Sequence, residues 1–172
     1  CRGLLKIYVE NEVDSLTLKI VPEGNLIGLT SVYDGANVFQ YSAYAYQDST
    51  IRLFDINIFK QLLQQNAAFA NEIINILCEN AVQTYGRFFS FTHKQSYGRM
   101  ADILLCLACR IYKDDEFDLL LSRKELADLT AMSTESVIRI LKKFKEEKLI
   151  SITGKTYRIL DHERMQQISD RG

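Results

Sequence analysis

The sequence predicts an α+β fold, in which a small β region is followed by helices and then by a compact mixed domain. Three observations support this class. Short segments rich in β-branched and aromatic residues, separated by turn signals, fill the first 54 residues. After Asp55 the apolar residues recur at three- and four-residue steps, which is the spacing of a helix face. The last third combines two capped helices with two short strands.

The composition is that of an ordinary globular chain. Of the 172 residues, 47% are hydrophobic and 25% are charged, which excludes collagen, coiled-coil rods and wholly disordered chains. The longest apolar run covers residues 103–109, far short of the roughly 18 residues that a membrane span needs. Four cysteines in a chain of this length do not indicate an oxidising compartment. We therefore expect a cytoplasmic protein with no membrane partner.

The β region begins with two predicted strands, residues 4–9 and 16–21, joined by the polar connection 10–15. Turn signals follow at residues 22–25 and 34–37. Two further strands are predicted at residues 41–46 and 50–54. Regular turns favour a small barrel or sandwich, although these strands alone make an incomplete one.

Two helices are predicted next, because Asp55 and Asn66 can each accept hydrogen bonds from the free amides of a first helical turn. The second helix, running towards His93, is apolar on more than one face and must be covered on more than one side. It is either a buried core helix or a dimerisation helix, and the spacing favours dimerisation. The predicted dimer contacts are Ile73, Leu77, Ala81, Tyr85 and Phe88.

A third helix is predicted over residues 97–112, where Cys106 and Cys109 form a C-x-x-C pair one helical turn apart. Such a pair can bind a metal or act in redox chemistry, but cysteine is also a common core residue. The apolar neighbours favour the core, and His93 and His162 have no partners at metal-ligand spacing. We predict no metal site and no cofactor.

The segment from residue 121 to residue 160 has the pattern of a helix-turn-helix followed by a hairpin. Ser122 and Glu125 form a capping box at the start of a helix over residues 123–129, and Ser133 can cap a second helix over residues 134–148. The second helix buries one stripe at helical spacing. This stripe consists of Val137, Ile140, Leu141 and Phe144.

The opposite face of the second helix is polar and basic, and the strands after it form a wing. Residues 122–159 carry a net charge of +4, although the whole chain carries −1. A charged helix face is usually only a solvated one. The combination of two caps, a tight turn, a buried stripe, a polar face and a wing instead indicates a helix that enters the DNA major groove. Double-stranded DNA is therefore the predicted partner.

The chain resembles the Crp/Fnr family of bacterial transcription regulators over nearly its whole length. The best-matched stretches are LSRKELADLTAMSTESVIRILKKFKEEKLIS, VPEGNLIGLTSVYDG and IRLFDINIFKQLL. The resemblance implies a partial β-roll of the cyclic-nucleotide-binding type in residues 1–65, a long dimerisation helix in 66–97 and a winged helix-turn-helix in 98–172. It also implies that the chain starts partway through the β-roll, truncated at its N-terminus, and that RNA polymerase is a partner.

The family resemblance assigns roles on the second helix of this motif. Glu135 and Arg139 occupy the two positions that read bases across most of the family, and Thr134 and Ile138 flank them. Arginine suits guanine O6 and N7, and glutamate suits cytosine N4. The phosphate-contact candidates are Arg123, Ser133, Ser136, Lys142 and Lys155. Ala131 stands where relatives often have glycine, which makes the turn a departure from the family pattern.

The effector pocket implied by the resemblance is formed by Gly28, Leu29, Thr30, Val38 and Phe39. Nucleotide-binding relatives grip the ribose with a glutamate and the phosphate with an arginine at these places. Here Leu29 and Val38 stand instead, so a phosphate would be poorly compensated. We predict that the effector is not cyclic AMP.

The sequence therefore predicts a homodimeric, sequence-specific transcription regulator that binds a palindromic operator. The alternative is a redox or small-molecule sensor that acts mainly through a protein partner bound by the winged helix. An enzyme is not indicated, because the chain has no phosphate-binding glycine loop and no recognisable catalytic arrangement.

Overall fold

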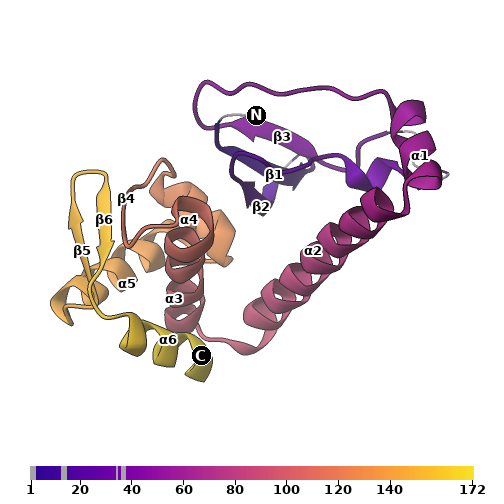
Figure 1. The fold of residues 1–172 in the computed structure, drawn as a ribbon. Coiled ribbons are helices and arrows are strands. Elements are labelled where there is room, and N and C mark those ends of the chain that lie inside the picture. The colour runs from indigo at the N-terminus through magenta and orange to yellow at the C-terminus, as the bar shows by residue number, and fades with distance from the viewer. Residues whose placement is uncertain (1–2, 13–14, 34, 36–37) are drawn as a thin grey trace.

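The computed structural model describes residues 3–12, 15–33, 35 and 38–172. Cys1, most of the turn predicted at residues 34–37 and two residues of the hairpin connection lie outside these ranges. Figure 1 shows an α+β fold, as predicted, with a small N-terminal sheet, the long helix α2, and a C-terminal group of helices with a second small sheet at its side.

The N-terminal sheet contains β1 (Leu5–Glu10), β2 (Ser15–Val21) and β3 (Ser42–Ala45) in the order β2-β1-β3. Both pairings are antiparallel, and the register of β1 against β2 shifts by one residue between Ile7 and Tyr8. A shift of this kind is a bulge, and it changes which side chains face the molecule on either side of it.

The strand predicted at residues 50–54 does not form. Thr50 makes a single bridge, and the chain then runs without regular structure to the start of α1. Leu53 is 89% exposed and Phe54 is 68% exposed. The β-forming residues of this segment have no described strand beside them, and a strand without a neighbour cannot satisfy its backbone.

Two helices follow at the predicted caps. In α1 (Ile56–Gln65) the carboxylate of Asp55 accepts hydrogen bonds from the first-turn amides, and in α2 (Ala67–His93) Asn66 does the same. The 27 residues of α2 make it the longest described helix. Figure 1 shows it running from α1, beside the sheet, to the start of α3.

The helix predicted over residues 97–112 is divided. Its first part is the α-helix α3 (Ser96–Cys106), and its second part is the π-helix η2 (Leu107–Tyr112). Lys113 then ends η2 in the left-handed conformation, with φ of 56°. The apolar spacing alone did not indicate the wider turn.

The C-terminal domain begins with α3 and η2 and closes around a sheet of order β4-β6-β5. Its further elements are β4 (Glu116–Asp118), α4 (Arg123–Thr130), α5 (Thr134–Glu146), β5 (Ile150–Thr153), β6 (Thr156–Ile159) and α6 (His162–Arg171). The wing predicted from the sequence is the hairpin β5–β6. Neither β4 nor α6 was predicted.

Helix α6 packs closely on α3 because Gly98 faces it. A Cβ atom at Gly98 would lie 2.7 Å from the Cα of Gly172 and 3.2 Å from the carbonyl oxygen of Ile168. Only a hydrogen atom fits there, so the glycine permits the close approach. The end of the chain is thereby fixed against the start of the domain.

The two halves of the molecule touch where β2 packs against α4. Lys6 of β1 forms a salt bridge of 3.6 Å with Glu125 of α4. Arg87 of α2 donates hydrogen bonds to the carbonyl oxygens of Thr17 and Leu18 in β2 and of Leu129 in α4. One guanidinium therefore joins the N-terminal sheet, the long helix and the helix-turn-helix.

Among the described residues, no helix has both the length and the apolar character needed to cross a membrane.

Candidate nucleic-acid interface

The helix-turn-helix is built by local sequence signals that form as predicted. The amide of Glu125 donates to Ser122 Oγ at 3.2 Å, and the amide of Ser122 donates to Glu125 Oε2 at 2.8 Å, which completes the capping box. At the second helix, the amide of Ser136 donates to Ser133 Oγ at 3.2 Å. Each cap satisfies an amide that would otherwise lack a partner, so both helices start at defined residues.

The turn between the two helices requires a left-handed residue, and that residue is Ala131, with φ of 49° and ψ of 53°. Alanine tolerates this conformation less well than glycine, because its Cβ approaches the following carbonyl oxygen. The turn is closed by a hydrogen bond of 3.0 Å from the amide of Met132 to the carbonyl oxygen of Ala127.

A second arginine, on α3, stabilises the turn through hydrogen bonds. Arg99 of α3 donates to the carbonyl oxygens of Thr130 at 2.9 Å and of Ala131 at 3.3 Å, and also to that of Lys94 at 2.9 Å. Arg99 was not among the predicted site residues, because a single arginine on a helix carries no local signal for contacts 31 residues away.

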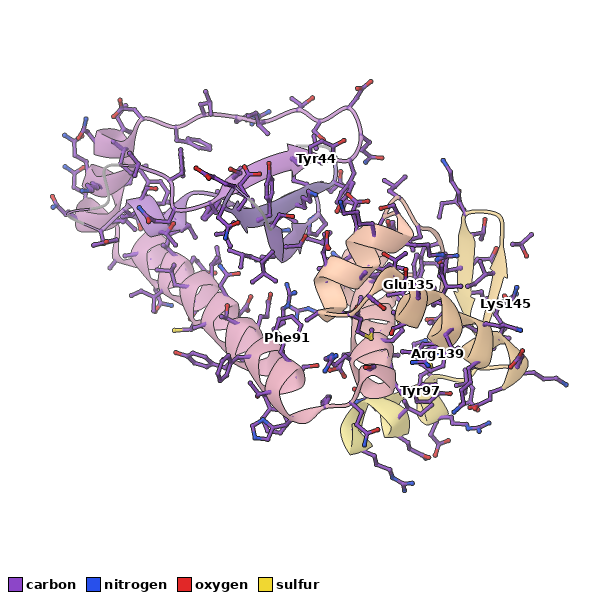
Figure 2. The ribbon with its side chains drawn as sticks, turned by 180° about the vertical axis from the view of Figure 1, so that it is seen from behind. Tyr44, Phe91, Tyr97, Glu135, Arg139 and Lys145 are labelled. Carbon is purple, nitrogen blue, oxygen red and sulfur yellow. The ribbon has the colours of Figure 1, made fainter. Side chains whose placement is uncertain are left out.

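The orientation of α5 follows from its buried stripe. Val137 and Phe144 have no exposed surface, Ile140 and Leu141 are nearly as buried, and the ring of Phe144 packs edge-on against Tyr97 at 4.6 Å. This stripe fixes α5 on the domain and turns its other face outward. Glu135, Arg139 and Lys145 follow one another along the helix in Figure 2.

The predicted base-reading residues all lie on the outward part of α5. Glu135 and Arg139 are exposed, Ile138 is 53% exposed, and Thr134 is partly buried at the start of the helix. The pKa of the Glu135 carboxyl is lowered by its own backbone amide and then by the Ser133 hydroxyl. Glu135 is therefore an acceptor at neutral pH, while no described residue forms a salt bridge or hydrogen bond with Arg139.

The cationic phosphate-contact candidates differ in their exposure and in the groups that they already contact. Arg123 is partly buried, with its guanidinium carbon 5.3 Å from the ring centre of Tyr157, and burial lowers its pKa. Lys142 is exposed and lies 3.8 Å from Glu146, and Lys155 is exposed in the wing.

The two serines named as phosphate contacts lie at the start of α5. The Ser133 and Ser136 hydroxyls bond to each other at 3.1 Å. Because both hydroxyls are engaged in the cap, a phosphate contact would have to share them.

A shallow hollow of about 350 Å³ lies beside α5 and brings three cations together. Arg123 and Lys142 line it as predicted phosphate contacts, and Lys145 joins them. Lys145 was not among the predicted phosphate contacts. Its position three residues after Lys142, on the same helix face, is the signal that could have identified it.

The predicted effector-pocket residues do not form one pocket. Gly28, Leu29 and Thr30 line a cavity of about 1070 Å³ between β2, α2, α3 and η2. Val38 and Phe39 are about two-thirds exposed and do not line this cavity. The ring of Phe39 nevertheless lies against Gly28, where a Cβ atom would come within 2.8 Å of it.

The surroundings of the cysteine pair are typical of structural cysteines rather than of reactive ones. Cys106 is partly buried at the end of α3, and burial raises the pKa of its thiol against the opposing effects of Arg110 and Arg87. A raised pKa lowers the fraction of reactive thiolate. Cys109 is exposed in η2. Within the described ranges, no group of three His, Cys, Asp or Glu side chains is placed to hold a metal ion.

One face of α2 is apolar and exposed. Of the predicted dimer contacts, Leu77, Tyr85 and Phe88 are exposed and Ala81 is partly buried. Ile73 is only 5% exposed and is covered within this chain, so it lies off the exposed face. The exposed apolar side chains of this face, which we call the α2 seam, are Ile74, Leu77, Val82, Tyr85, Phe88 and Phe89.

Comparison with known proteins agrees with this geometry. Residues 98–168 match the family model of the Crp-like helix-turn-helix domain. The chain is 24% identical to the transcriptional regulatory protein btr of Bordetella pertussis, over 96% of this chain and 70% of that protein. It is also 24% identical to the cAMP-activated global transcriptional regulator CRP of Salmonella typhimurium, over 90% of this chain and 76% of that protein.

Solved structures share the fold. FixK2 from Bradyrhizobium japonicum superimposes with a TM-score of 0.88 over 97% of this chain and 83% of that chain, at 16% identity. A CooA mutant from Carboxydothermus hydrogenoformans superimposes with a TM-score of 0.78 over 98% of this chain and 76% of that chain, at 19% identity.

The sequence matches are regulators of transcription rather than enzymes. They extend over nearly the whole chain, and the shared fold includes the N-terminal sheet, the long helix and the helix-turn-helix. The chain therefore carries a Crp-like helix-turn-helix domain over residues 98–168, is distantly similar to CRP over nearly its whole length, and is a DNA-binding transcription regulator of the Crp/Fnr type.

Proposed function

We propose that this protein acts as a homodimer that reads a palindromic operator through α5 and responds to an effector other than cyclic AMP. The observation that carries the proposal is the outward pair Glu135 and Arg139, held on a helix whose opposite stripe is fully packed. A recognition helix needs both features, because its side chains can discriminate between bases only when its backbone is fixed.

The two side chains offer complementary chemistry one helical turn apart. Arg139 has its donors available for the two acceptors of guanine, and the ionised Glu135 can accept from the amino group of cytosine. Ile138 lies between them as an apolar residue suited to a thymine methyl group. Around this centre, Arg123, Lys142 and Lys145 provide positive charge for the phosphates, which position the protein without reading sequence.

The α2 seam supports a twofold dimer. Leu77, Tyr85 and Phe88 of this seam, with Ala81 between them, follow one another at steps of three or four residues, as side chains do where two helices pack along each other. Apolar side chains such as Tyr85, 70% exposed, and Phe88, 68% exposed, form a continuous apolar strip along a helix of 27 residues. A second α2 covers such a strip, and the symmetry then places two α5 helices in successive major grooves, about 34 Å apart.

The proposal that cyclic AMP is not the effector rests on the lack of a charged side chain where the cyclic phosphate would bind. The related CRP proteins are named as cAMP-activated, but here Val38 and Phe39 stand at the places of the phosphate-gripping pair, and both are about two-thirds exposed. Isothermal titration calorimetry is expected to show no saturable heat with cyclic AMP. Micromolar binding would contradict this part of the proposal.

The operator symmetry is tested by selecting bound sequences from random duplexes and by footprinting the best site. We expect a palindrome whose two half-sites are protected equally. The affinity should fall steeply with salt, because several phosphates are neutralised on binding. A protected site without twofold symmetry, or an affinity insensitive to salt, would overturn the proposal.

The dimer is tested with Tyr85→Glu, which puts a charge in the middle of the α2 seam. We expect the variant to be monomeric by sedimentation at concentrations at which the parent protein is dimeric, and to bind half-sites only weakly. The matched control is Glu72→Lys, a charge change on the opposite, exposed face of α2. A parent protein that sediments as a monomer at all concentrations would contradict the dimer.

A further inference from the structure

The cavity of about 1070 Å³ between the two halves of the molecule contains a cluster of cations that the proposed DNA interface does not use. Lys19 comes from β2, Arg87 from α2 and Arg110 from η2, and all three line this cavity. They lie far apart in sequence, so tertiary folding alone brings them to one space. They come from different elements than the turn at residues 28–31, which carries the predicted effector residues.

Two of these cations, Lys19 and Arg87, are partly buried, and their hydrogen bonds are made to neutral groups. Lys19 donates to the amide oxygen of Asn80 at 2.5 Å. Arg87 donates only to main-chain carbonyl oxygens, among them those of Thr17 at 3.0 Å and Leu129 at 3.2 Å. Its Nε atom is buried and has no hydrogen-bond partner among the described residues. A buried charged donor left without a partner is unfavourable, and a bound acceptor would satisfy it.

Two carboxylates, those of Glu23 and Asp102, line the cavity beside this cluster. Within the described ranges, no carboxylate forms a salt bridge with Lys19, Arg87 or Arg110. Asp102 lines the cavity but is engaged by Lys94 at 2.8 Å and by two serine hydroxyls. Glu79 of α2 is close enough to raise the pKa of Lys19, but burial and the charge of Arg110 outweigh it and lower that pKa.

Like charges gathered in a partly buried space repel each other more strongly than they would in water. The remaining walls are largely apolar, with Ile20, Ile103 and Leu105 among the lining residues. The volume exceeds what a small metabolite needs. The site therefore combines a charged end with an apolar body.

We propose that this cavity binds a small organic dianion, a phosphate monoester or a dicarboxylate, with its charged group held by Lys19, Arg87 and Arg110. The ligand's oxygens would accept from Lys19 and Arg110, and from the guanidinium of Arg87 once it leaves its main-chain partners. Its apolar part would lie against the leucine and isoleucine walls.

Such a ligand would also act on DNA binding. Arg87 holds the carbonyl oxygen of Leu129, near the end of α4 and before the turn that leads into α5. An anion that draws Arg87 away from this carbonyl changes the support of the helix-turn-helix. Coupling between two binding sites is reciprocal, so the anion must change operator affinity as DNA changes anion affinity. This regulatory consequence rests on the proposed function, whereas anion binding itself does not.

The first experiment measures binding of two probes, phenyl phosphate and succinate, by calorimetry at constant ionic strength set with sodium chloride. We expect saturable binding of at least one probe to the parent protein. Arg110→Gln and Lys19→Met should each weaken it at least tenfold, and Arg110 is exposed, so its substitution leaves the fold intact. The control is Arg52→Gln, an exposed arginine outside the cavity, which should bind as the parent does.

Absence of saturable binding of both probes would overturn the inference. Binding that survives Arg110→Gln and Lys19→Met would place the anion elsewhere and overturn it too. Circular dichroism of each variant distinguishes a lost site from a lost fold.

The second experiment repeats operator binding with the saturating probe. We expect operator affinity to change at least threefold in the parent protein and to stay constant in Arg110→Gln. A protein that binds the operator but no probe would refute only the cavity. A protein that binds the probe through these residues but no palindromic DNA would refute only the proposed function.

Discussion

The C-terminal domain and the N-terminal half of this chain are packed very differently. Side chains with no exposed surface are common after residue 98, where they include Met100, Leu104, Leu126, Val137, Phe144 and Leu149. Among the described residues of the N-terminal half, the buried apolar side chains are fewer, and none is completely buried. Large apolar side chains are instead exposed there, such as Tyr33, Leu53 and Phe54.

This difference in packing shows which parts of the protein are held mainly by contacts within their own domain. Most of the buried core around α5 comes from the C-terminal domain itself, so the position of this helix depends mainly on residues of that domain. The N-terminal sheet and α2 leave apolar surface uncovered. They meet the domain through the buried side chains of Leu4 and Ile20 and through polar contacts, such as Lys6 with Glu125. Their stability and arrangement therefore depend on what else binds them.

The largest expected effect comes from breaking the core of the C-terminal domain. Phe144→Ala removes a completely buried ring that packs on Tyr97. We expect the free energy of unfolding to fall by about 3–5 kcal/mol and operator binding to be lost with it. Urea unfolding followed by circular dichroism measures the first quantity. A loss below about 1 kcal/mol would show that the core of the C-terminal domain is not closely packed around Phe144.

A smaller effect, confined to DNA binding, is expected at the surface of the same domain. Arg139→Ala should leave the stability unchanged and cost about 1–3 kcal/mol of discrimination at one base pair of each half-site. Competition binding with operators altered at single positions measures it. Lys142→Ala is the comparison, since loss of a phosphate contact should weaken all sequences alike and reduce the salt dependence. Equal behaviour of the two variants would argue against a base-reading role for Arg139.

A substitution in the turn between α4 and α5 is expected to stabilise the same domain. Ala131→Gly relieves the left-handed alanine, and the gain is partly offset by the greater freedom of glycine in the unfolded chain. We expect stabilisation of up to about 1 kcal/mol in urea unfolding. The same substitution at Ala127, which is helical and 3% exposed, should destabilise by about 1 kcal/mol. Destabilisation by Ala131→Gly would contradict the conformation of the turn.

The smallest effect is expected in the N-terminal half. Leu53→Ser replaces a side chain that is 89% exposed, so the free energy of unfolding should change by no more than about 0.5 kcal/mol. The comparison of the two regions would fail if this variant were as destabilised as Phe144→Ala. Solubility at high concentration is a useful second measurement, because the polar side chain removes exposed apolar surface.

Much of the fold was predictable where local chemistry decides. Asp55, Asn66, Ser122 and Ser133 cap helices at the predicted residues, because capping depends on side chains within three positions of the amides they bind. The strand predicted at residues 50–54 was wrong, because a strand needs a neighbour that its own sequence does not specify. The change from α3 to the π-helix η2 left no trace in the apolar spacing.

The candidate interface was predictable to a similar degree. The outward position of Glu135, Ile138 and Arg139 follows from the stripe of buried residues between them, and the structure has them there. Lys145 was missed as part of the basic hollow, and Ile73 was placed on the dimer face although the chain itself covers it. A helix that is apolar on two faces gives no local sign of which one its own chain will cover.

The sequence by itself determined the α+β class, the similarity to Crp/Fnr regulators and the two capped helices of the helix-turn-helix, since these depend on caps, periodic stripes and motifs whose members lie close together along the chain. Only the tertiary structure decided how the two halves are joined. Arg87 and Arg99 donate to carbonyl oxygens 31 to 70 positions away, and Lys19 and Arg110 meet in a cavity between separate elements. Contacts to main-chain oxygens need no particular residue at the other end, so the sequence carries no pattern from which they could be predicted.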